Sequence, residues 1–222
     1  EALRTHFFAV IVIVLLIGFG LALFIGQVAI IESTVYQSSL LAAFLRLSAV
    51  YVVSLFVITS IVREFHDHLI YLWLSLPIQR STYFLGKLSG FALVASITAI
   101  LFGVALLGYA PYQQVGLWTL SLFCELLLIM AVSLLCVLTF PQTIQAFSVV
   151  LGFYILARSI SAMQLMARGP LNDPQSWVDQ LINVLVKLLA MLLPNLEHFT
   201  QSEWLVYHTG NFESLLEVVV QT

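Results

Sequence analysis

Five long apolar stretches, separated by shorter polar segments, dominate the chain. Each contains about 20 residues or more, which is enough for an α-helix to cross the ~30 Å hydrocarbon core of a bilayer. Lipid offers no hydrogen-bond partner to backbone N–H and C=O groups, so each stretch is expected to be helical. The pattern predicts membrane spans at roughly Phe7–Ile31, Leu40–Val62, Lys87–Tyr109, Leu117–Phe140 and Thr143–Met163.

The links between these spans differ in length and character. Three of them, Glu32–Ser39, Ala110–Gly116 and Pro141–Gln142, are short and force the helices on either side to run antiparallel. The link between the second and third spans is different, because it forms part of an amphipathic stretch over residues 63–88, REFHDHLIYLWLSLPIQRSTYFLGKL. A proline, Pro77, ends its leucine-rich part, and proline cannot continue a helix.

Composition agrees with a membrane protein. Hydrophobic residues make up 61% of the chain and charged residues 9%, whereas a soluble domain carries roughly 25% charged residues. The mean hydropathy is +1.06. The net charge is −3 and no basic patch suggests a nucleic-acid partner. The two cysteines, Cys124 and Cys136, fall in one predicted helix about 18 Å apart, too far to form a disulfide within it.

The basic residues predict how the spans are oriented. Arg4 lies before the first span, and Arg63, Arg80 and Lys87 lie between the second and third. Lys and Arg in short loops mark the cytoplasmic side. We therefore expect a multi-pass protein with a cytoplasmic N-terminus, whose opposite side carries most of the acidic residues.

Residues 164–222 form a second region, distinct from the five spans of residues 1–163. Asp173-Pro174 is a favourable helix start, and the segment after it has polar residues on one face and apolar residues, including Trp177, on the other. This pattern predicts helices lying at the extracytoplasmic interface and leading to a final span. The alternative is a sixth span here, with Asp179 and Lys187 in hydrocarbon at about +3 kcal/mol per ion.

Three charged residues, Arg46, Glu125 and Arg158, lie inside predicted spans. Counting from the external ends puts each roughly 9–12 Å deep, at one level in the outer half of the bilayer. An ion there needs a partner or water, so we expect Glu125 to pair with at least one arginine. Two interpretations remain: a structural pair with the arginines reaching toward the head groups, or a polar patch facing a translocation path and suited to an anionic head group.

The sequence contains no recognisable catalytic, metal or nucleotide site. His66 and His68 do not share a helical face, and His198 and His208 belong to no convergent ligand set. HExxH and serine-elbow motifs are missing, and Gly86-Lys87 lacks the upstream glycine of a phosphate-binding loop. We expect no catalytic residue, no metal and no cofactor on this chain.

The stretch between the second and third spans resembles the cytoplasmic loop of ABC type-2 transporter permeases. The resemblance is carried by Arg63-Glu64, the leucine-rich Leu72–Leu76 ending in Pro77, then Arg80, and Gly86-Lys87 at the start of the third span. Leu193-Pro194-Asn195 is similar to an element that these permeases carry before their last span. The chain departs from the family at Asp67-His68-Leu69, where a small Gly-Thr pair is common.

The resemblance implies an all-α, six-helix type-2 ABC exporter permease whose last span is absent from this sequence. It implies a coupling helix at residues 63–80 that docks a cytoplasmic ABC ATPase subunit, which would carry the ATP and Mg²⁺. The residues it assigns to docking are Glu64, Asp67, Leu72, Trp73, Pro77 and Arg80. It further implies a second permease copy or paralogue, a dimeric path and a bacterial inner membrane.

Two other function classes remain open from the residues alone. One is a membrane-embedded enzyme using Glu125 with His198 or His208 near the external surface, and the other is a membrane assembly protein that transports nothing.

Overall fold

The computed structural model describes residues 7–28, 33–67, 80–140 and 142–167. Within these ranges the chain forms five helices and no strand: α1 (Phe7–Val28), α2 (Ser33–His66), α4 (Arg80–Leu106), α5 (Tyr112–Thr139) and α6 (Thr143–Ala167). Each contains a segment long and apolar enough to cross a membrane. The five expected spans are therefore confirmed as helices, while the external helices and final span expected after residue 167 lie outside the described residues.

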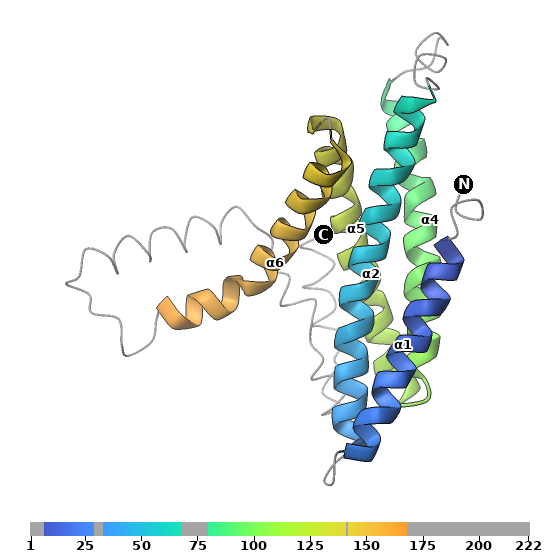
Figure 1. The fold of residues 1–222 in the computed structure, drawn as a ribbon, viewed down its shortest axis with the longest axis vertical. Helices are drawn as coiled ribbons and strands as arrows, with labels where there is room; N and C mark the ends of the chain where they lie inside the picture. The colour runs from blue at the N-terminus through green and yellow to red at the C-terminus, as the bar shows by residue number, and fades with distance from the viewer. Residues whose placement is uncertain (1–6, 29–32, 68–79, 141, 168–222) are drawn as a thin grey trace, which may run out of the picture.

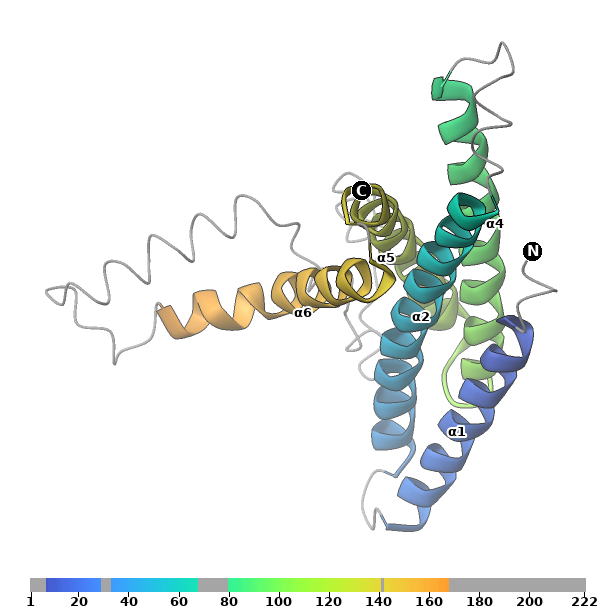
Figure 2. The ribbon, with the colours of Figure 1, turned by 45° about the horizontal axis from the view of Figure 1, so that its top comes forward.

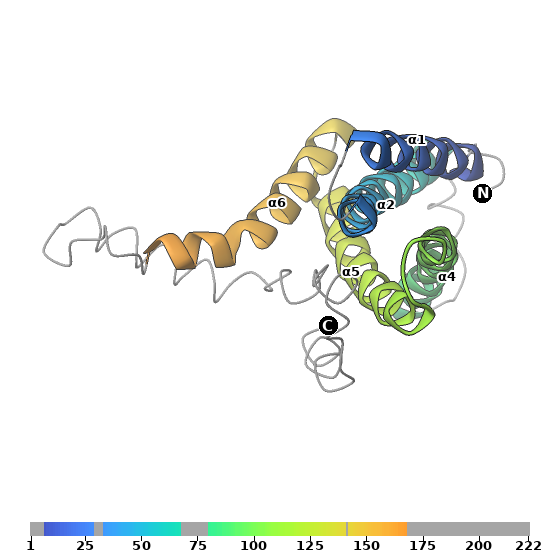
Figure 3. The same cartoon turned by 90° about the horizontal axis from the view of Figure 1, so that it is seen from below.

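The helices form a bundle centred on α2 and α5 (Figure 1). In the membrane-spanning segments of these two helices, 67% and 56% of the residues are buried, compared with 17% for α1. Figure 3 shows α1 beside α2 and α4 beside α5, and α6 leaving the bundle at an angle on the other side. α6 packs on α5 and α2, and Figure 2 shows its C-terminal half pointing away from the other helices.

The helix ends differ from the expected span ends by several residues. α2 continues through Arg63 and Glu64 to His66, so the first residues of the expected coupling helix belong to α2. α4 begins at Arg80, and α5 begins at Tyr112 directly after Pro111, which has φ −61° and ψ 140°. The reason is physical: hydropathy marks the part of a helix that lipid covers, whereas the helix itself continues until its capping residues end it.

Small residues bring neighbouring helices close together at two places. At Gly26 of α1 a Cβ atom would overlap the Gln37 side chain of α2, and at Gly103 of α4 it would overlap the Thr119 hydroxyl of α5. Close backbone approach through glycine is a common way to pack membrane helices. The α1–α2 and α4–α5 hairpins are therefore tight near their connecting turns, at the lower end of the bundle in Figure 1.

Candidate functional site

A row of buried polar side chains runs along one face of α5. Gln114, Trp118, Ser121 and Glu125 are all at most 7% exposed. Their spacings of four, three and four residues place them on a single helical face. This face packs against α2, from which Arg46 reaches across. We call Arg46, Trp118, Ser121 and Glu125 the mid-helix cluster.

The Arg46 guanidinium is enclosed by three different groups from α5. Its Nη1 donates a hydrogen bond to Glu125 Oε2 at 2.8 Å, and Nη1 and Nη2 both lie 3.4 Å from the Ser121 hydroxyl. Its Cζ lies 5.2 Å from the centre of the Trp118 ring, in range of a cation–π interaction. The Arg46 and Glu125 side chains are 2% and 0% exposed, so this ion pair is fully enclosed by protein.

The ion pair lies near the middle of α5. Glu125 is 13 residues from Tyr112 in a helix of 28 residues, or ~20 Å along it, close to its midpoint. The expected depth of 9–12 Å below the membrane surface stays a prediction, because the helix extends beyond the part that lipid covers and its first residue does not mark that surface. The expected pairing of Glu125 with an arginine is present, but Arg46 does not reach toward the head groups, since its side chain is enclosed.

Arg158, the third intramembrane charge, lies on α6 and is partly buried. Its Nη1 donates a hydrogen bond to the Tyr154 hydroxyl one turn earlier, at 3.2 Å. Tyr154 is 3% exposed and lies within electrostatic range of Glu125, Arg46 and Arg158. The three charges predicted from the sequence therefore gather around one buried tyrosine, which the sequence reasoning missed along with Trp118 and Ser121.

Some buried polar atoms on this face of α5 make no hydrogen bond within the part of the chain that the structure describes. Among the described residues, Gln114 Oε1, Trp118 Nε1 and Glu125 Oε1 are buried and accept or donate no hydrogen bond. Native interiors rarely leave such atoms without a partner. These buried atoms add to the polar character of the face that holds α2 through Arg46.

A second ion pair, which we call the end pair, joins α2 to α4. Lys87 Nζ of α4 donates to Glu64 Oε1 of α2, whose side chain is 7% exposed. Lys87 Nζ also lies 5.5 Å from the centre of the Phe91 ring. Phe91 in turn makes an edge-to-face contact with Phe56 at 6.0 Å, and Phe56 contacts Phe7 of α1 at 4.6 Å. Below the end pair, these aromatic rings connect α1, α2 and α4.

The residues predicted to dock an ATPase occupy different positions. Glu64 points into the bundle toward Lys87, while Asp67 is exposed directly after α2. Arg80 is the first residue of α4, and Leu72, Trp73 and Pro77 lie outside the described residues. A docking role for this group stays a prediction. For Glu64 the structure provides another role, because its carboxylate links the ends of two helices.

The described helices bring no three His, Cys, Asp or Glu side chains close enough to hold a metal ion. Cys124 and Cys136 are both buried free thiols. His198 and His208, which the enzyme alternative requires, lie outside the described residues.

Comparison with known proteins gives one family. The model of the ABC-2 family transporter proteins matches residues 27–195, which is 169 of the 222 residues. The matched range contains α2, α4, α5 and α6, and with them both the mid-helix cluster and the end pair. No curated protein and no solved structure matches the chain.

Proposed function

The chain belongs to the ABC-2 family of transporter proteins, and from this premise we propose that it is the membrane subunit of an ATP-driven exporter. Its family and its five apolar helices make it a multi-pass transport permease rather than a catalyst. Within the proposal, ATP and Mg²⁺ are bound by a cytoplasmic ABC ATPase subunit; residues 1–222 contain no phosphate-binding loop that would hold them.

The proposed docking place is the segment that joins α2 to α4. It contains Asp67, Leu72, Trp73 and Pro77, and the basic residues around it favour the cytoplasmic side, which is also the side proposed for the N-terminus. The membrane that we propose, from the family, is a bacterial inner membrane. One observation supports this more than any other: the end pair ties α2 to α4 at the two ends of the segment. A force applied to the segment therefore acts on both helices together.

The mid-helix cluster provides the next step of the proposed coupling. Arg46 lies 18 residues before Glu64 on the same helix, ~27 Å away along α2, and is bonded to Glu125 of α5. A displacement of the α2 end is passed to α5 through a short, directional ion pair. The translocation path itself would form between this chain and a second copy or a paralogue, as expected for the family.

The experiment starts from the full chain, purified with an affinity tag in mild detergent. We expect an ATPase with a phosphate-binding loop to co-purify and to be identified by mass spectrometry. The double variant Leu72→Ala/Trp73→Ala should reduce the amount of bound ATPase at least tenfold. Leu93→Ala is the matched control, because Leu93 is an apolar side chain of α4 that is 65% exposed on the lipid-facing surface.

Two results would count against the proposal. If no ATPase accompanies the parent chain, coupling to a separate ATPase is refuted. If the Leu72→Ala/Trp73→Ala variant keeps as much ATPase as Leu93→Ala, at the same rate of ATP hydrolysis, the docking segment has been assigned wrongly.

A further inference from the structure

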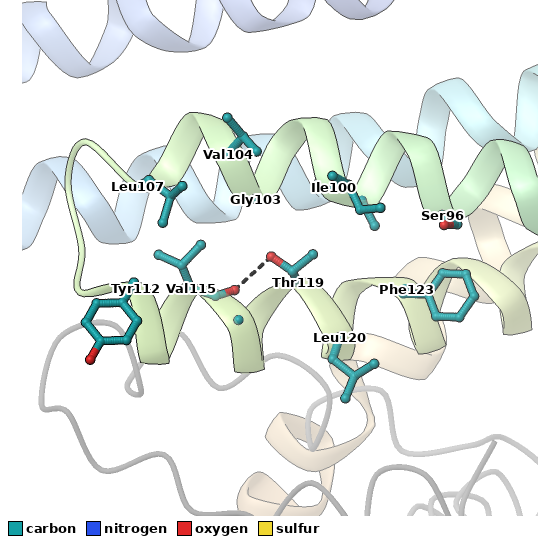
Figure 4. Close-up of a pocket in the computed structure, with 12 residues that line it drawn as sticks. Ser96, Ile100, Gly103, Val104, Leu107, Tyr112, Val115, Thr119, Leu120 and Phe123 are labelled. Atoms are coloured by element: carbon teal, nitrogen blue, oxygen red, sulfur yellow. Dashed lines mark hydrogen bonds between the residues drawn. The ribbon is translucent and has the colours of Figure 1, made fainter.

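A groove of about 440 Å³ lies between α4 and α5. Figure 4 shows its walls: Ile100 and Val104 come from α4, Leu107 from the turn directly after it, and Val115, Leu120 and Phe123 from α5. The Thr119 hydroxyl donates to the carbonyl of Val115 at 2.7 Å, so it is already engaged within its own helix. The groove therefore presents mainly hydrocarbon to whatever occupies it.

The height of the groove corresponds to one leaflet of a bilayer. It extends from Leu107, beside the α4–α5 turn, to Ser96, which is 11 residues or ~16 Å along α4. On α5 it extends from Tyr112 to Phe123, which is again 11 residues. The hydrocarbon core is ~30 Å thick, so the groove begins near one membrane surface and ends near the midplane.

The groove opens toward lipid. Ile100, Val104 and Leu120 are 55%, 59% and 46% exposed although they lie within membrane-spanning segments. The hollow has a clear origin in the sequence. Gly103 lets α4 and α5 approach closely at Thr119, while Gly116 leaves open space where a side chain would otherwise stand. A groove with apolar walls does not retain water, so it is filled by the hydrocarbon around it.

Polar groups stand at one end of the groove, at the level expected for lipid head groups. Tyr112, the first residue of α5, is 75% exposed, and its hydroxyl accepts a hydrogen bond from Gln113 Nε2 at 3.4 Å. Tyrosine is enriched at the membrane interface because its ring is apolar and its hydroxyl is polar. The groove thus combines an apolar channel one leaflet long with a polar entrance.

We propose that this groove is a phospholipid-binding site that holds one acyl chain, with the head group beside Tyr112 and Gln113. Its volume falls within the roughly 300–1,000 Å³ typical of sites for small organic ligands. The site lies in the leaflet next to the α4–α5 turn, opposite the end pair. It does not depend on ATP coupling, so the proposal stands separately from the proposed function.

The test uses a variant that fills the groove without disturbing the helices. A Cβ atom at Gly116 meets no atom within 4 Å, so Gly116→Leu adds a side chain to the groove without a backbone clash. Gly90→Leu is the matched control: a Cβ atom there also meets nothing within 4 Å, but Gly90 does not line the groove. Val104→Trp fills the groove from the opposite wall. It gives an independent test if Gly116→Leu does not fold.

The full chain and each variant are reconstituted in vesicles of phosphatidylethanolamine with a diazirine in the middle of one acyl chain. After irradiation, mass spectrometry locates the lipid adducts. We expect groove residues of α4 and α5 to be labelled at least fivefold more than the exposed face of α1. Gly116→Leu and Val104→Trp should abolish this excess, whereas Gly90→Leu should leave it unchanged.

Two outcomes would overturn the proposal. In the first, the groove residues are labelled no more strongly than α1 and the filling variants do not change this labelling. The groove then makes only the ordinary lipid contacts of any exposed helix. The other is photocross-linking from a benzoylphenylalanine at Val104 to protein instead of lipid. In that case the occupant is a second copy or another part of this chain.

Discussion

Removing one partner of the Arg46–Glu125 pair should destabilise the bundle far more than removing both. The change to make is Glu125→Leu, compared with the double variant Arg46→Met/Glu125→Leu. In the single variant the Arg46 charge remains inside the α2–α5 interface, where its side chain is 2% exposed. From the mid-helix cluster, the Ser121 hydroxyl at 3.4 Å and the Trp118 ring still contact the guanidinium.

The expected magnitude follows from the burial. Breaking a fully buried ion pair by removing one partner typically costs about 3–5 kcal/mol, and a charge near the centre of a membrane helix costs about 3 kcal/mol on insertion scales. Because Ser121 and Trp118 still contact the guanidinium, we expect the lower value for Glu125→Leu. A loss of about 3 kcal/mol raises the unfolded fraction about 100-fold.

The double variant should be close to the parent in stability. Replacing both members of a buried ion pair by apolar residues of similar volume is often neutral or stabilising. We expect Arg46→Met/Glu125→Leu to lie within about 1 kcal/mol of the parent. The charge-swapped variant, Arg46→Glu/Glu125→Arg, should also be more stable than either of its single changes.

The assay is equilibrium unfolding of the full chain in mixed micelles by titration with sodium dodecyl sulfate, followed by circular dichroism. Ser133→Ala is the matched control. Ser133 is buried on the same helix as Glu125, and its hydroxyl donates to the carbonyl of Ile129 in its own helix. We expect this control within about 1 kcal/mol of the parent, because the lost hydrogen bond joins the hydroxyl only to the backbone of its own helix. If Glu125→Leu is as stable as Ser133→Ala, the ion pair does not hold α2 against α5 and the reasoning fails.

Two further predictions concern α4. Glu64→Gln should leave the co-purified ATPase in place but lower its rate of hydrolysis in the complex, and the reversal Glu64→Lys/Lys87→Glu should restore part of that rate. An unchanged rate in Glu64→Gln would remove the end pair from the proposed coupling. Gly103→Val should lower the free energy of unfolding by about 1–3 kcal/mol in the same assay, because the new side chain overlaps Thr119. Adding Thr119→Ala should recover part of this loss. A Gly103→Val variant as stable as the parent would contradict the close approach of α4 and α5.

The spans could be predicted from the sequence because hydropathy averages over about 20 residues, a length that the bilayer fixes. The helix ends could not, since they depend on local capping. Pro111 illustrates this: it interrupts the apolar pattern, yet α5 begins directly after it, because proline is compatible with a helix start. The shift at this end moved Glu125 from the outer part of its helix to the midpoint.

The ion pairs show a similar limit. That Glu125 pairs with an arginine could be predicted, because an ion in hydrocarbon needs a partner. Which arginine it contacts depends on how α2 and α6 are rotated about their axes, and a single sequence does not contain that information. The inward position of Glu64 was missed for the same reason, since its partner Lys87 is 23 residues away and meets it only after α2 and α4 pack together.

The two ion pairs differ in strength, and this difference indicates how the bundle deforms. The mid-helix pair is fully enclosed, whereas the Lys87 side chain of the end pair is 21% exposed, and partly solvated ion pairs are the weaker kind. Separating α2 from α5 at Arg46 would cost about 3 kcal/mol, while apolar contacts elsewhere can slide at a smaller cost. We therefore infer that α2 and α5 tilt together about the mid-helix cluster. Relative movement is then concentrated where α1, and the part of α4 beyond the end pair, meet this central pair. A transport cycle that parts α2 and α5 at the mid-helix cluster would need an interaction of comparable strength to replace the one between Arg46 and Glu125.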